Sequence, residues 1–162
     1  MKNLILIRHG KSSWNEPVHD SERLLNEKGI ENSIKIANLT VDKIHPKSEI
    51  WSSFANRAFQ TARLFVETWN LPDESIQIKK ELYTFDGKKL EEIVKSTSNN
   101  CENVILFGHN NAITDFVNKF GDIFIDNVPT SGFVSINFDT NNWSTITKGK
   151  IISTTFPRDY KL

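Results

Sequence analysis

Short apolar runs separate amphipathic segments along most of this 162-residue chain. Leu4–Ile7 and Asn103–Gly108 are continuous apolar runs, which is typical of strands covered on both faces of a sheet. Two further strands are predicted, one at Ser48–Ser53 and one in the alternating segment "SIQIKKEL". A segment with helical periodicity follows each run, so the pattern predicts repeated β–α units.

Four helices are predicted, at residues 27–39, Asn56–Trp69, Lys88–Ser96 and Asn111–Phe120. Asn26 is the expected N-cap of the first helix. The apolar face of that helix is predicted to carry Ile30, Ile34 and Ala37. Gly121 is expected to end the last helix.

The hydrophobic period changes to two after the fourth helix. Gly132–Asp139, a turn at Asn141–Asn142 and the segment "WSTIT" predict an antiparallel hairpin. Repeated β–α units that end in a hairpin predict a three-layer α/β/α sandwich, with a mostly parallel central sheet and antiparallel edge strands. The sequence contains no internal repeat and no linker rich in Gly or Pro, so residues 1–162 are expected to form a single domain.

Composition limits the classes of partner. Lys and Arg together number 20, as do Asp and Glu, so the formal net charge is zero and no general basic field favours nucleic acid or an anionic membrane. Any anion must therefore be recognised by a few placed cations. Cys101 is the single cysteine, which excludes an internal disulfide and fits a reduced, cytoplasmic protein. The first apolar run is too short for an export signal, and no stretch reaches membrane-spanning length.

Two of the predicted strands end on a histidine. Arg8, His9 and Gly10 follow the first strand, and His109 follows "NVILFG". Ligands of open α/β sheets bind beyond the carboxyl ends of the strands, so we expect both histidines at one site. We predict that one histidine is a nucleophile and that the other stabilises charge or assists proton transfer.

Arg57 is a further candidate because it lies near the start of a predicted helix. The unpaired backbone N–H groups and the positive end of the dipole make such a place a natural anion site. A cation there is unfavourable unless an anion binds beside it. Arg8, Arg57 and Arg23 are therefore expected to clamp a phosphate with their planar guanidinium groups. The positive charge of Arg8 and Arg57 should lower the pKa of His9 below its usual value of roughly 6.5.

Four sequence blocks resemble the histidine phosphatase superfamily, also called the phosphoglycerate mutase-like family. "LILIRHGKSSWN" contains the "RHG" signature of that family. "SSFANRAFQTA" is similar to its Ser-x-x-x-Arg-Ala-x-Gln-Thr-Ala block, "LFGHNNAI" to the block with the second histidine, and "NVPTSGFVSINF" to its closing segment. "RHG" alone would be weak, but four blocks in the family order span most of the chain.

The resemblance implies the roles of four residues. His9 would be the nucleophile that accepts the phosphoryl group, and Arg8, Arg57 and His109 would complete the phosphate site. It also implies that the protein needs no metal or other cofactor, because arginines and histidines neutralise the phosphoryl oxygens. The expected partner is a phosphate-bearing substrate.

Within the family, the chain resembles the compact bacterial phosphohistidine phosphatases. Asp20, Arg23, Leu25 and Gly29 fit their Asp-x-x-Arg-Pro-Leu-x-x-x-Gly pattern, with Leu24 in place of proline. Glycolytic mutases, by contrast, are much longer chains. The resemblance to this branch favours phosphohistidine in proteins as the substrate.

Substrate-binding residues are predicted on the loop after the first strand. An asparagine at the position of Asn15 contacts phosphate in the mutase branch, and Arg23 and Ser13 are assigned to substrate binding with it. Gly10 is expected to let the chain turn tightly beside the phosphate.

The general acid has two candidates. Many phosphatases of the family protonate the leaving oxygen with a carboxylic acid that follows the third strand. Glu81 and Asp86 lie there, and Glu81 is favoured by its position. A third alternative is that no acid is used, since a phosphoramidate such as phosphohistidine expels its leaving group more easily than an ester.

The leading hypothesis is a metal-independent phosphatase that forms a phosphohistidine intermediate and acts on phosphohistidine in proteins. The alternatives are a phosphatase of small esters such as sugar or nucleoside phosphates, and a phosphate-binding module with little catalysis. A metal-dependent hydrolase using His9 and His109 is a weaker alternative. His19 and His45, the remaining histidines, lack metal-ligand spacing and are expected on the surface.

Overall fold

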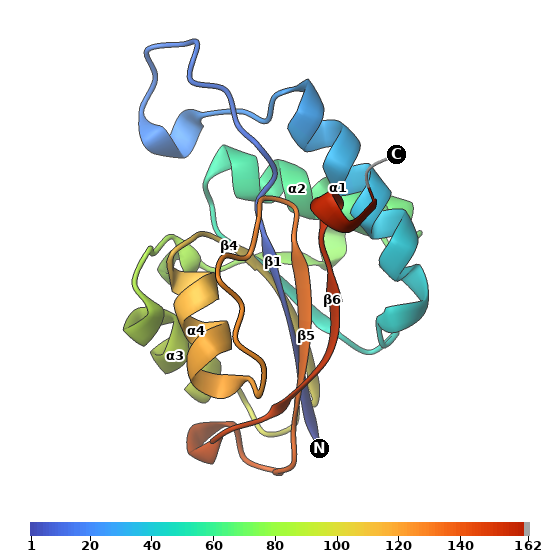
Figure 1. Ribbon diagram of the computed structural model, residues 1–162, viewed down its shortest axis with the longest axis vertical. Coiled ribbons are helices and arrows are strands. Elements are labelled where there is room, and N and C mark those ends of the chain that lie inside the picture. The colour runs from blue at the N-terminus through green and yellow to red at the C-terminus, as the bar shows by residue number, and fades with distance from the viewer. Residues whose placement is uncertain (161–162) are drawn as a thin grey trace.

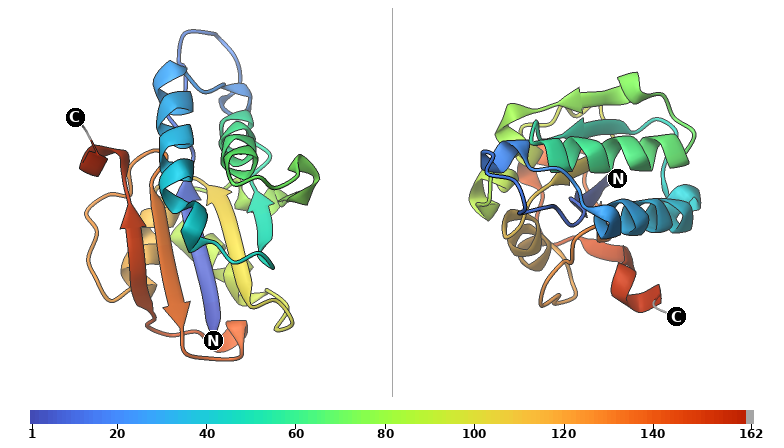
Figure 2. Two further views of the ribbon diagram at one scale, coloured as in Figure 1. Left: turned by 90° about the vertical axis from the view of Figure 1, so that its right-hand side faces the viewer. Right: turned by 90° about the horizontal axis from the view of Figure 1, so that it is seen from above.

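The computed structural model describes residues 1–160, which form a central sheet with helices on both faces (Figures 1 and 2). The strands are β1 (Lys2–Arg8), β2 (Glu49–Ser52), β3 (Ile76–Ile78), β4 (Asn103–Gly108), β5 (Phe133–Phe138) and β6 (Lys150–Thr155). The helices are α1 (Glu27–Thr40), α2 (Asn56–Thr68), α3 (Gly87–Lys95) and α4 (Ala112–Phe120), and short 3-10 turns join several of these elements.

The strand order in the sheet is β3-β2-β4-β1-β5-β6. β1 pairs in parallel with β4, β4 with β2, and β2 with β3, whereas β5 runs antiparallel to both β1 and β6. This arrangement confirms the predicted α/β fold with a mostly parallel sheet and antiparallel pairing at one edge.

Alternating residues of the strands supply two apolar layers. Ile5 and Ile7 of β1 pack with α1 and α2, while Leu4 and Leu6 pack with α3 and α4 on the opposite face. All four side chains are buried. A strand covered on both faces must be apolar at every position, which explains the continuous run at the start of the chain.

The predicted hairpin is wrong in its second strand. The segment "WSTIT" forms a 3-10 turn at Trp143–Thr145, and β5 pairs instead with the later strand β6. The Asn142 side chain accepts a hydrogen bond from the backbone N–H of Ser144, which favours a turn over a strand. Trp143 is fully buried, and its indole N–H donates to the carbonyl of Cys101, so the aromatic residue fills the core.

The buried face of α1 also differs from the prediction. Ala37 is buried as predicted, but Ile30 and Ile34 are more than a third exposed. The side of α1 that packs on the loop after β1 carries the small residues Gly29 and Ser33. A Cβ atom on Gly29 would lie 2.2 Å from the carbonyl oxygen of Lys11. The close approach of helix and loop therefore requires a small residue at position 29 and turns the neighbouring isoleucines toward the surface.

The third predicted strand is shorter than expected, because β3 ends at Ile78 and a 3-10 turn covers Lys80–Leu82. His19 and His45 are exposed, as predicted. In the described part of the chain, no helix combines the length and the apolar character that crossing a membrane requires.

Candidate active site

Both predicted histidines lie at the carboxyl edge of the sheet, and the structure brings them together. β1 and β4 are adjacent, and their register places Arg8 beside Gly108. His9 and His109 follow directly, with ring centroids 5.3 Å apart. Both rings are buried. The parallel strands β1 and β4 thus end beside each other, and one histidine follows each strand.

Arg57 lies between the two rings, as its place at the start of α2 allows. Its guanidinium is almost fully buried. Nε is 3.4 Å from Nε2 of His9, and one terminal nitrogen is 3.4 Å from Nδ1 of His109. The predicted trio of His9, Arg57 and His109 is therefore a contiguous cluster.

The hydrogen bonds of His9 fix the tautomer of its neutral ring. Nδ1 lies 2.7 Å from the carbonyl oxygen of Gly10. A carbonyl only accepts, so Nδ1 carries the proton and donates it. Nε2 therefore holds the lone pair and faces the N–H of Arg57.

His109 has the opposite tautomer. Arg57 can only donate, so Nδ1 of His109 accepts from it, and Nε2 carries the proton and donates to the Ser53 hydroxyl at 2.9 Å. The second histidine is thus oriented by a residue at the end of β2. Ser53 belongs to the "SSFANRAFQTA" block, but the sequence did not assign it this contact.

Asp20 joins the arginines from the loop between β1 and α1. One carboxylate oxygen accepts from Arg57 at 2.9 Å, and its backbone carbonyl accepts a second bond from Arg57 at 2.6 Å. The other carboxylate oxygen pairs with Arg23 at 3.2 Å. Tyr83 donates its hydroxyl to Asp20 at 2.6 Å. This carboxylate holds two guanidinium groups side by side near His9.

Arg23 is buried and well fixed, in agreement with a role at the site. It donates to the Ser12 hydroxyl at 2.7 Å, and its guanidinium stacks on the Trp14 ring at 3.5 Å. Charge, hydrogen bonding and stacking all restrict its position, as a planar guanidinium allows. We call Arg8, His9, Arg23, Arg57 and His109 the histidine–arginine cluster.

Arg8 is anchored on the segment before β5. It donates to the carbonyl of Val128 at 3.0 Å. The backbone N–H of Ser131 donates to the carbonyls of Arg8 and His9, which ties the same segment to the end of β1. Nε of Arg8 is buried and has no hydrogen-bond partner among residues 1–160.

Burial shifts the pKa values of both histidines downward. The pKa of His9 is lowered to about 4, mainly because burial disfavours the charged ring; the Gly10 carbonyl opposes this, and Arg57 and Arg8 add to it. The direction predicted from the sequence is confirmed, but burial rather than arginine charge is the main cause. Burial, His9 and Arg57 lower the pKa of His109 to about 3. Both rings are therefore neutral at pH 7.

Asp20 is ionised over the same range. Burial raises its pKa, but hydrogen bonds from Tyr83 and Arg57 and the charges of Arg57 and Arg23 outweigh this and bring the value to about 2. The pKa of Tyr83 is raised by burial and by its bond to Asp20. Asp20 thus acts as a fixed negative charge and holds no proton to give.

Gly10 has a different role from the predicted one. Its φ is not positive, so no special turn requires glycine. A Cβ atom there would lie 2.9 Å from both the Gly29 carbonyl and the Ser33 hydroxyl, so packing against α1 requires it. Its N–H donates to the Thr61 hydroxyl of α2 at 2.9 Å.

The remaining predicted residues have no hydrogen bond or ion pair to the histidine–arginine cluster within the described residues. The Ser13 hydroxyl accepts from the backbone N–H of Asn15, which is exposed. Glu81 is exposed on the 3-10 turn after β3. Asp86 caps α3 by accepting from the backbone N–H of Lys88. These predicted roles remain untested.

Two functional residues escaped the sequence prediction. Asp20 was matched to a motif without a role, and Tyr83 was not singled out. The only signal for Asp20 was its spacing of three from Arg23, which a 3-10 turn brings together. No group of three or more His, Cys, Asp or Glu side chains in residues 1–160 is arranged to hold a metal ion.

Comparisons with solved structures find proteins of the same fold. The SixA protein of Agrobacterium tumefaciens shares 24% identity with the chain at a TM-score of 0.78, covering 95% of this chain and 97% of that one. A protein histidine phosphatase SixA complexed with tungstate shares 21% identity at a TM-score of 0.80, covering 98% and 99%. A mycobacterial glucosyl-3-phosphoglycerate phosphatase shares 13% identity at a TM-score of 0.69, covering 94% and 98%. These likenesses show a common fold.

Curated protein sequences gave no match. The sequence model of the histidine phosphatase superfamily (branch 1), however, matches residues 4–100. That range contains four members of the histidine–arginine cluster: Arg8, His9, Arg23 and Arg57. The chain therefore belongs to the histidine phosphatase superfamily.

Proposed function

We propose that the protein is a metal-independent phosphatase that transfers a phosphoryl group to Nε2 of His9 and then to water, and that its substrate is phosphohistidine in proteins. The observation that carries this proposal is the hydrogen bond from Nδ1 of His9 to the Gly10 carbonyl. It leaves the Nε2 lone pair beside Arg57. A neutral nucleophile among fixed cations suits attack on a phosphate dianion.

The reaction has two steps. The Nε2 lone pair of His9 forms a bond to phosphorus, the P–N bond of the substrate breaks, and its electron pair goes to the leaving imidazole nitrogen, which takes a proton from solvent. Water then attacks phosphorus, the bond to Nε2 breaks, and phosphate leaves with the oxygen of the water. Throughout, Nδ1–H donates to the Gly10 carbonyl and stabilises positive charge on the phosphorylated ring.

Asp20, the carboxylate that contacts the histidine–arginine cluster within residues 1–160, holds no proton at pH 7, which supports an easily expelled leaving group. Asp20 has a pKa of about 2 and is ionised. His109 has a pKa of about 3 and is neutral. An alkoxide leaving group needs a proton donor, whereas the imidazole of a phosphohistidine is a far better leaving group.

An aromatic rim beside His109 also supports an imidazole leaving group. We use the term aromatic rim for Phe54, Tyr83 and Phe85. The rings of Tyr83 and Phe85 lie edge-on to His109, with centroids 5.3 and 5.4 Å away. Phe54 packs against Tyr83, and Phe54 and Phe85 are about half exposed. Exposed rings at the mouth of a charged site favour a flat, partly apolar group next to the phosphate.

Rapid-quench kinetics with a ³²P-labelled phosphohistidine peptide test the proposal. We expect wild type to accumulate an acid-labile, alkali-stable phosphoenzyme, and His9→Ala to form none and to lose roughly 10³-fold or more in turnover. His19→Ala, a change at an exposed histidine, is the control and should behave as wild type.

A panel of substrates separates the finer assignment from its alternatives. Phosphohistidine peptides should exceed sugar and nucleoside phosphates in kcat/KM. Higher values for the esters would instead assign a small-molecule phosphatase. Phosphate binding without any phosphoenzyme would assign a binding module, and unchanged turnover of His9→Ala would contradict the nucleophile.

A further inference from the structure

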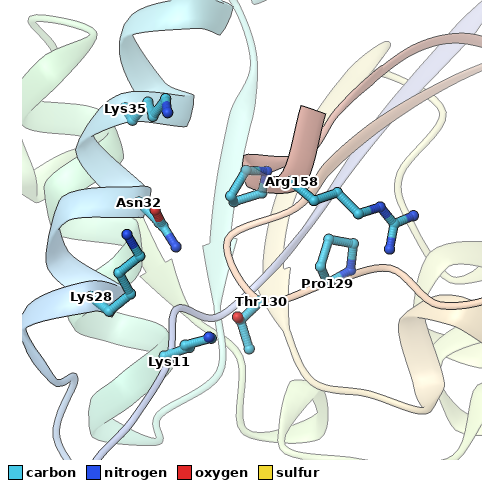
Figure 3. Close-up of a pocket in the computed structure, with 8 residues that line it drawn as sticks. Lys11, Lys28, Asn32, Lys35, Pro129, Thr130 and Arg158 are labelled. Carbon is cyan, nitrogen blue, oxygen red and sulfur yellow. The ribbon is translucent and has the colours of Figure 1, made fainter. Parts of the chain in front are cut away.

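A basic groove lies beside the loop that follows β1, and its residues take no part in the chemistry described above. It encloses about 490 Å³ and is lined by Lys11, Lys28, Asn32, Lys35, Pro129, Thr130, Pro157 and Arg158. Figure 3 shows Lys28, Asn32 and Lys35 projecting from α1, with Pro129, Thr130 and Arg158 across from them. We call this set the basic groove.

The basic groove adjoins the histidine–arginine cluster through two chain segments. Lys11 follows Gly10 directly, and its carbonyl accepts from the backbone N–H of Asn26, which fixes the loop against α1. Thr130 precedes Ser131, whose N–H donates to the carbonyls of Arg8 and His9. The basic groove and the histidine–arginine cluster are therefore formed by neighbouring residues of the same two segments.

The charges of the basic groove are concentrated and largely unneutralised. Four of its lining residues are cations and none is acidic. The one ion pair they form with described residues joins Lys28 to Glu31 at 4.0 Å, and Lys35 donates to the carbonyl of Tyr160. In a chain of zero net charge, such a concentration of cations attracts an anionic ligand.

The length of the basic groove indicates what kind of anion it takes. Lys28, Asn32 and Lys35 are spaced by four and three residues, so they share one face of α1 and span about 10 Å along it. A single phosphate meets both lysines only where their flexible side chains converge on it. A peptide with several carboxylates along its length can contact all three side chains and the Thr130 hydroxyl.

We propose that the basic groove binds an acidic segment of the protein that carries the phosphohistidine. The proposal rests on the proposed function for the identity of that protein, but the groove itself makes a separate prediction about binding. Lysines at the surface add attraction without rigid geometry, so the groove should raise affinity and the rate of association more than it changes the chemical step.

Binding of a fluorescent, unphosphorylated Asp/Glu-rich peptide, followed by anisotropy, tests the basic groove without any catalysis. We expect the double variant Lys28→Glu/Lys35→Glu to weaken binding at least tenfold, and 0.5 M NaCl to do the same to wild type. Lys150→Glu is the matched control, because Lys150 is exposed at the start of β6, whereas the groove residues Pro157 and Arg158 follow the far end of that strand. A neutral peptide of equal length should bind to none of them.

Turnover completes the test. The double variant should raise KM for an acidic phosphohistidine peptide at least tenfold, while kcat/KM for p-nitrophenyl phosphate stays within twofold of wild type. Equal peptide binding by wild type and double variant would overturn the proposal, as would tighter binding of an oligonucleotide of the same charge or of tripolyphosphate. If wild type binds the acidic peptide but hydrolyses no phosphohistidine, the proposed function is wrong, and the proposal that the basic groove binds an acidic segment is still supported.

Discussion

The arginines of the histidine–arginine cluster and the lysines of the basic groove differ in how deeply they are buried and in which groups they pair with. Arg57 and Arg23 are buried and share the carboxylate of Asp20, and Arg57 also contacts a ring nitrogen of each histidine. Lys28 and Lys35 of the basic groove are exposed or half-buried, and no carboxylate lines the groove with them. A buried cation needs a partner because water no longer solvates it, whereas a surface lysine keeps its hydration.

This difference suggests two roles: the buried arginines hold the phosphoryl group in a fixed position, and the surface lysines attract an anionic ligand. Asp20 holds the guanidinium groups in place before any phosphate arrives, which removes the cost of organising them during the reaction. The lysines are free to move, so they increase the local concentration of an anion without orienting it. Geometric changes should therefore damage the histidine–arginine cluster, and changes of charge should damage the basic groove.

The largest effect among the cations is expected for Arg57→Lys, which preserves the charge and removes the fork. A lysine ammonium cannot contact His9, His109 and Asp20 together, so kcat/KM for p-nitrophenyl phosphate should fall by roughly 10²–10³-fold. Steady-state kinetics measures this. Arg63→Lys, an exposed position on the same helix, should change it less than twofold. A fall below fivefold for Arg57→Lys would show that charge alone suffices at this position.

Local patterns predicted the positions of these residues because both strands are buried on both faces. β1 and β4 are continuous apolar runs, and a polar residue that follows such a run must lie at the sheet edge, which located His9 and His109 correctly. Arg57 followed from the start of α2. The helix, the strand and the histidines are all encoded within a few neighbouring residues.

Contacts between distant segments could not be predicted in this way. Tyr83 donates to Asp20, which lies 63 residues away in the sequence, and no local sequence pattern near either residue predicts this hydrogen bond. β6 was missed because Ile151 and Ile152 point to opposite sides, one buried and one exposed, in a mainly polar segment. The neighbouring "WSTIT" is similarly rich in strand-favouring residues, but burial of Trp143 accompanies a 3-10 turn there.

Substitutions at Asp20 distinguish the effect of side-chain geometry from the effect of charge. We expect them to lower kcat/KM less than Arg57→Lys does. Asp20→Ala removes the side-chain bonds to Arg57, Arg23 and Tyr83, so kcat/KM should fall by roughly 10–100-fold. Asp20→Asn keeps a carbonyl oxygen as acceptor but removes the negative charge. It should bind tungstate about 2- to 5-fold tighter than wild type, the effect of one partly exposed charge.

Isothermal titration calorimetry with tungstate, together with kinetics on p-nitrophenyl phosphate, distinguishes the two variants. Asp73→Ala is the control, since Asp73 pairs with the exposed Arg63. Weaker tungstate binding by Asp20→Asn would mean that the carboxylate charge is needed for the arrangement of the arginines. Unchanged kinetics of Asp20→Ala would contradict its positioning role.

The smallest expected effect is a loss of folding stability in acid. It arises from the buried histidines His9 and His109 and not from exposed histidines. The pKa values of His9 and His109 are lowered to about 4 and about 3, against roughly 6.5 in the unfolded chain. Between these values the unfolded state binds more protons than the folded state, so stability is complete above pH 6.5 and falls as the pH drops toward 4.

Thermal unfolding between pH 7.5 and pH 4.5 measures the effect, and Tm should fall by several degrees or more below pH 6.5. The double variant His9→Gln/His109→Gln should lose much of this dependence, while His19→Ala/His45→Ala, at exposed positions, should retain it. Asp20 contributes in a separate window, since its lowered pKa makes stability fall only below about pH 4. A Tm that is flat down to pH 4.5 in wild type would mean that both buried rings accept protons without cost, and the neutral nucleophile on which the mechanism depends would have no basis.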